Sequence, residues 1–120
     1  MTDLPPLTPE TLWSILKGDI SDEMVNRLLW DGLGYQQDLD TGAWTTAAVD
    51  PDWAEAYPVP PDFIGSRPAT VKLTRSIPKE NKQLLKEQLG FEGYQVAELT
   101  PTKTRRATAV NWLLSNMKGS

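Results

Sequence analysis

The sequence contains neither cysteine nor histidine. Without cysteine there is no disulfide, no thiolate nucleophile and no cysteine-ligated metal. Without histidine the chain lacks the commonest general base and the commonest metal ligand. We therefore expect a non-enzymatic protein with no catalytic residue, no cofactor and no metal. A small enzyme is the third choice, and it would have to use the loop carboxylates Asp38, Asp40, Asp50, Asp52 and Asp62.

Long hydrophobic segments are missing as well. No apolar run approaches the roughly eighteen residues that a transmembrane helix needs. The first residues, MTDLPP, do not resemble a signal peptide. We therefore expect a soluble, cytoplasmic protein without a membrane span.

The residues that are present suffice for one hydrophobic core. A chain of 120 residues buries about two thirds of its unfolded surface, and five tryptophans supply large apolar side chains. Ten prolines and eight glycines indicate short elements joined by turns. We expect a single domain over 1–120, with an ordered core at about 6–117 and a proline-rich connector at about 58–61.

Local patterns predict a single compact domain of the α+β class. Thr8 and Ser21 are typical N-cap residues before apolar stripes, and the Asp-Thr-Gly turn that contains Gly42 is typical of a hairpin. Leu-Gly-aromatic occurs at 33–35 and 89–91 and predicts helices that end at a left-handed glycine. The expected order is helices over 7–18 and 21–34, a hairpin over 35–49, a strand over 69–77, a helix over 78–90, a strand over 93–100 and a closing helix over about 102–117.

Charge is distributed unevenly along the chain. Residues 1–63 hold two basic and twelve acidic residues, a net charge of −10, whereas residues 64–120 hold ten basic and four acidic residues, a net charge of +6. The two halves either neutralise each other on folding or form a two-faced surface that attracts a partner.

The closing helix begins with an unusual cluster of cations. Either Thr102 or Thr104 is a suitable N-cap, yet Lys103, Arg105 and Arg106 follow where the helix dipole favours carboxylates. We expect Arg106 to lie at the edge of the core and to pair with a carboxylate of the acidic half. Lys103 and Arg105 are expected to face solvent.

A basic surface near the C-terminus is therefore the candidate site. Seven-residue spacing places Trp112 near Arg105 on the helix surface. The predicted partner- or anion-binding residues are Arg67, Lys72, Arg75, Lys103, Arg105 and Trp112. We expect them to dock an acidic protein partner. The alternatives are binding of RNA, other nucleic acid or an anionic ligand, and an ordinary solvated surface.

Five stretches of the chain match no generic catalytic or cofactor motif: LLWDGLGY, DPDWAEAYP, PPDFIGSRPATVKLTRSIP, ENKQLLKEQLGF and TKTRRATAVNWLL. Together they resemble a family of unknown function found in cyanobacteria and in the chloroplasts of algae and plants. The resemblance covers about residues 5–115, and it implies a cytoplasmic or stromal protein linked to photosynthetic physiology, with no site residues to carry over.

Overall fold

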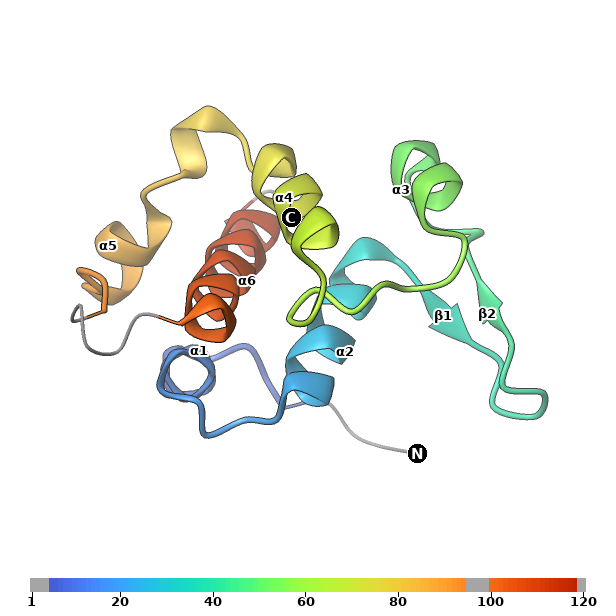
Figure 1. The fold of residues 1–120 in the computed structure, drawn as a ribbon, viewed down its shortest axis with the longest axis horizontal. Helices are drawn as coiled ribbons and strands as arrows, with labels where there is room; N and C mark the ends of the chain where they lie inside the picture. The colour runs from blue at the N-terminus through green and yellow to red at the C-terminus, as the bar shows by residue number, and fades with distance from the viewer. Residues whose placement is uncertain (1–4, 95–99, 119–120) are drawn as a thin grey trace.

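A computed structural model describes residues 5–94 and 100–118, apart from the side chain of Lys118. Its longest helix, α6 (Pro101–Lys118), lies at the centre of the helical part (Figure 1). The helices α1 (Pro9–Lys17), α2 (Asp22–Leu33), α4 (Arg67–Ser76) and α5 (Leu84–Leu89) all contact α6. Because α6 is surrounded in this way, Ala109, Val110 and Leu113 are almost completely buried.

The first two helices begin and end where the sequence predicts. The Thr8 side chain accepts a hydrogen bond from the Thr11 amide at 3.2 Å, and Ser21 caps α2 in the same way. Gly34 ends α2 at φ 101°. A side chain on Gly34 would collide with the carbonyl oxygen of Ala48, because the built Cβ lies only 2.3 Å from it.

The predicted hairpin is present and makes the fold α+β. Strands β1 (Gln36–Gln37) and β2 (Trp44–Thr45) pair antiparallel, with Gln36 opposite Thr45. Gly42 takes φ 75° in the connecting turn, as predicted. The helix α3 (Pro51–Ala56) follows, and together with the hairpin it lies at one end of the molecule (Figure 1).

The strand predicted over 69–77 is wrong, because this segment forms α4. The alternation of Val71, Leu73 and Arg75 with polar residues imitates a strand, but a helical pattern is present as well. Ala69, Leu73 and Ile77 are four residues apart and all three are buried. A strand would place Val71 and Arg75 on the same face as these three residues, but Val71 is only half-buried and Arg75 is exposed, so the buried stripe follows the helical spacing.

The helix predicted over 78–90 is divided into the 3₁₀ turn η1 (Lys79–Asn81) and α5. The division is stabilised from α6, where the Asn111 side chain accepts a hydrogen bond from the Leu85 amide and donates one to the carbonyl of Asn81. Gly90 ends α5 in the left-handed conformation, as predicted. Most of the strand predicted over 93–100 lies outside the described residues.

The closing helix begins earlier than predicted. Its N-cap contact is made by Thr100, whose hydroxyl accepts from the Lys103 amide at 3.1 Å, so neither Thr102 nor Thr104 is the cap. Lys103 is thus the one cation of the first turn, and Arg105 and Arg106 belong to the second. Since the dipole effect fades within a turn, the electrostatic conflict is smaller than the sequence indicates. No helix in the described part of the chain is long and apolar enough to cross a membrane.

Candidate functional site

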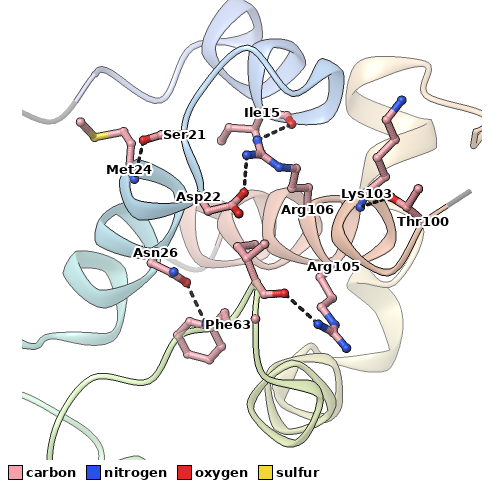
Figure 2. Close-up of polar contacts among 12 residues, drawn as sticks. Ile15, Ser21, Asp22, Met24, Asn26, Phe63, Thr100, Lys103, Arg105 and Arg106 are labelled. Carbon is pink, nitrogen blue, oxygen red and sulfur yellow. Dashed lines mark hydrogen bonds and ion pairs between the residues drawn. The ribbon is translucent and has the colours of Figure 1, made fainter. Parts of the chain in front are cut away.

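Arg106 has the structural role that the sequence predicts. Its side chain is almost completely buried, and it donates hydrogen bonds to the carbonyl of Ile15 at 3.1 Å and to the carboxylate of Asp22 at 2.5 Å. Figure 2 shows these two contacts, which join the last turn of α1 to the first turn of α2. Arg106 is therefore occupied inside the fold and cannot receive a partner.

Arg105 does not simply face solvent, contrary to the prediction. It leaves α6 in a different direction from Arg106 (Figure 2) and donates to the carbonyl of Ile64 at 2.9 Å. The half-buried guanidinium lies near the turn formed by Asp62, whose carboxylate accepts hydrogen bonds from Asn26, Ile64 and Gly65. The pKa of Asp62 is held below its ordinary value of 3.8, first by the Gly65 amide and to a smaller extent by Arg105.

Lys103 and Trp112 do not form a basic surface with Arg105. The Lys103 ammonium lies 5.5 Å from the centre of the Tyr94 ring, and the side chain is half-buried. Trp112 is 8% exposed and donates its indole N–H to the hydroxyl of Ser76 at 3.1 Å. Trp112 is thus a core residue, and its expected place on a docking surface is wrong.

The remaining three predicted residues do gather on α4. Arg67, Lys72 and Arg75 line a groove of about 800 Å³ between α3 and α4. The opposite wall carries Trp53 and Tyr57. This groove, which we call the α3–α4 groove, combines three cations with two aromatic rings.

The three cations of the groove differ in their engagement. The Lys72 ammonium lies 5.0 Å from the centre of the Trp53 ring and 3.7 Å from the Asp52 carboxylate. Arg67 and Arg75 are exposed, and neither guanidinium makes a hydrogen bond or ion pair with the residues that the structure describes. Each guanidinium can therefore offer its paired N–H donors to an external carboxylate or phosphate.

Sequence reasoning missed the two aromatic residues of the groove. Trp53 is largely buried and stacks edge-on against Phe63 at 5.7 Å, which fixes its position under Lys72. Tyr57 is half-buried, and its backbone carbonyl accepts from the hydroxyl of Tyr35. Trp53 in α3 and Tyr57 at its C-cap are four residues apart, a spacing typical of one helix face, and this is the signal in the sequence that could have identified them.

The loop carboxylates do not gather into a metal site. No group of three or more Asp or Glu side chains in the described residues is arranged to hold an ion. Asp62 is occupied by the turn described above, and Asp52 pairs with Lys72.

Comparison with known proteins places this fold in a family. Among functionally curated proteins there is no match to the chain. Among solved structures, a solution NMR structure of a protein is similar, with 56% sequence identity, a TM-score of 0.83 and 96% of each chain covered. The family model described as a domain of unknown function, DUF1823, matches residues 6–118. The chain therefore belongs to the DUF1823 family.

Proposed function

We propose that this protein is a non-enzymatic interaction factor that docks an acidic segment of a partner protein against α4. The observation that carries the proposal is the convergence of Arg67, Lys72 and Arg75 on one groove. This moves the expected docking surface away from the start of α6, because Arg105 is engaged with the Ile64 carbonyl.

The chemistry of the groove suits carboxylates on a peptide. Exposed arginines bind carboxylates through two parallel hydrogen bonds, and aromatic residues in a pocket are frequent anchors at interfaces. Arg67 and Arg75 are eight residues apart on α4, which is about 12 Å along the helix axis. Two acidic side chains of an extended segment, four residues apart, span about the same distance.

Nucleic acid is the less favoured partner. The helix α3, which forms the other wall, places Asp52 in the lining of the groove, and the same segment carries two more carboxylates, on the N-cap Asp50 and on Glu55. A nucleic acid presents negative charge continuously along its backbone, so part of it would meet these carboxylates. A protein segment can place neutral residues at those positions.

The biological setting forms part of the proposal. The resemblance to a cyanobacterial and chloroplast family supports a role in a photosynthetic organism, in the cytoplasm or the stroma. An assembly or regulatory partner fits a small binding protein better than a substrate does, because the chain has no histidine or cysteine for common catalytic chemistry.

A charge-reversal experiment tests the docking surface. Tagged wild-type protein, the Arg67→Glu/Arg75→Glu variant and a Lys79→Glu/Lys86→Glu control are used to capture proteins from cells of the source organism. The control makes the same change of net charge at exposed lysines that do not line the groove.

Captured proteins are identified by mass spectrometry, and the same samples are titrated with single-stranded RNA at two salt concentrations. The proposal expects a partner retained by wild type and control and lost by the arginine variant. Identical partners for all three proteins would refute it. RNA binding that depends on Arg67 and Arg75, without such a partner, would favour the nucleic-acid alternative.

A further inference from the structure

A second groove lies on the other side of α4. Two adjoining cavities of about 570 and 260 Å³ share Thr74, Thr104 and Thr108. The first is bounded by α4 and the start of α6, and the second continues towards Ile77 and Leu85. We call this continuous feature the threonine groove.

The threonines make this groove apolar, although each carries a hydroxyl. The hydroxyls of Thr74, Thr104 and Thr108 each donate to the backbone carbonyl four residues earlier, and the Thr70 hydroxyl is held between the carbonyls of Phe63 and Ser66. Because the hydroxyls are engaged with backbone carbonyls, the groove is left with methyl groups as its main lining. Val71, Ala107 and Leu85 extend this apolar surface.

Cations stand at both ends of the threonine groove. Arg67 and Arg105 line the first cavity, where Arg105 is engaged with the Ile64 carbonyl and Arg67 is the cation open to a ligand. Lys82 lines the second cavity; its ammonium donates one hydrogen bond to the Thr74 carbonyl at 2.7 Å and keeps two further donors. No Asp or Glu is among the residues that line either cavity. A ligand complementary to this groove is therefore acidic at its two ends and apolar between them.

The surroundings of α6 indicate the shape of the occupant. Four helices pack around α6. On the side of α6 that lines the threonine groove, however, Thr104 is exposed and Ala107 and Thr108 are only half-buried. The side of the groove that α4 forms, from Arg67 to Ile77, extends about 15 Å along the helix axis, which is nearly three helical turns. A further helix laid over Thr104 and Thr108 would cover this remaining face of α6, as ridges of one helix fill the grooves of others.

We infer that the threonine groove binds an amphipathic helix of a partner protein, with its apolar face on the threonine methyls and its acidic ends at Arg67 and Lys82. The inference rests on the proposed function for the identity of the partner class, and it adds the form of the segment. Arg67 lines both grooves, so one partner can contact α4 on both sides.

A defined peptide tests this inference directly. The probe is a lactam-stapled helix of about 14 residues, or about 21 Å, with leucines at i, i+3, i+4 and i+7 and glutamates in its first and last turns. A scrambled peptide of the same composition is the control. Binding is followed by fluorescence anisotropy and by the amide shifts of the ¹⁵N-labelled full chain.

Matched substitutions separate the methyl surface from the hydroxyls. Thr74→Val/Thr104→Val keeps the methyl groups and volume, so the affinity is expected to change by less than about twofold. Thr74→Glu/Thr104→Glu places charges in the apolar part, and the affinity is expected to fall by at least about tenfold. Thr74 and Thr104 are both exposed, so the fold tolerates these changes, and circular dichroism verifies it.

The outcomes are decisive for each proposal separately. Tighter binding of the amphipathic peptide than of the scrambled one, with amide shifts at Val71, Thr74 and Ala107, supports the inference. Equal binding of the two peptides, shifts confined to α3, or self-association abolished by the Glu variant overturns it. Arg75 lines only the α3–α4 groove, so Arg75→Glu is expected to leave the peptide affinity unchanged while it weakens capture of the natural partner.

Discussion

Replacement of Arg106 tests whether this cation stabilises the fold. In Arg106→Ala the loss of the Cγ and Cδ methylenes costs about 1.6 kcal/mol at roughly 0.8 kcal/mol each. The lost polar contacts add about 1 kcal/mol, because the Ile15 carbonyl keeps a hydrogen bond from Gly18 and the Asp22 side chain, 56% exposed, is rehydrated. The free energy of unfolding should therefore fall by about 3 kcal/mol.

Two further variants divide this loss into its parts. Arg106→Met keeps most of the stem, so it should lose only the polar part, about 1 kcal/mol. Arg27→Ala is the matched control, because Arg27 pairs with Glu23 at 3.0 Å on the surface of a single helix. Such i, i+4 pairs contribute about 0.3–0.5 kcal/mol, and the stem of Arg27, whose side chain is 32% exposed, loses less on removal than the buried stem of Arg106.

Urea unfolding followed by tryptophan fluorescence measures these differences. With an m value of about 1.5 kcal/mol/M, the loss in Arg106→Ala lowers the midpoint by about 2 M. A midpoint shift no larger than that of Arg27→Ala would refute the reasoning. Equal losses in the Ala and Met variants would show that the stem contributes nothing.

Three other substitutions have defined outcomes. The pKa of Asp62 is lowered in the folded state, so the ionised carboxylate contributes stability above pH 3.8 and this contribution is lost as the pH falls below that value. The difference in urea midpoint between wild type and Asp62→Ala should therefore shrink between pH 6 and pH 2.5. Gly32→Ala should destabilise by about 1–2 kcal/mol in thermal unfolding, since its Cβ would lie 2.7 Å from the Trp112 ring. Tyr35→Phe should cost about 1 kcal/mol in urea unfolding through loss of the 2.7 Å hydrogen bond to the Tyr57 carbonyl, and an unchanged midpoint would contradict this.

The predictable parts of this fold are those that local chemistry determines. Thr8 and Ser21 cap their helices, and Gly34 and Gly90 end theirs, because each contact lies within a few residues of the chain. The pattern of residues 69–77 does not determine their structure, because it fits both the alternation of a strand and the spacing of a helix. Only the packing of Leu73 and its neighbours on α6 selects the helix.

The candidate site required contacts between distant parts of the sequence. Arg105 meets the carbonyl of Ile64, 41 residues away, and Trp112 meets Ser76, 36 residues away. Neither Ile64 nor Ser76 carries a charge or belongs to a motif from which the contact could be predicted. By contrast, the pairing of Arg106 with some carboxylate is predictable from the sequence, although the identity of Asp22 is not, because an arginine beside a buried stripe needs a partner.

The separation of charge along the chain is only partly cancelled by folding. Asp22–Arg106 and Asp52–Lys72 join the two halves, while the acidic half keeps an exposed surplus of carboxylates. Arg67 and Arg75, about 12 Å apart on α4, are beyond the Debye length of about 8–10 Å at moderate salt, so their mutual repulsion is small. Unpaired arginines at this spacing therefore cost the fold little stability while they leave a local positive field on a protein whose net charge is −4. The proposed acidic partner would be repelled by the carboxylates of residues 1–63 and attracted by the cations on and beside α4, which favours one orientation of approach.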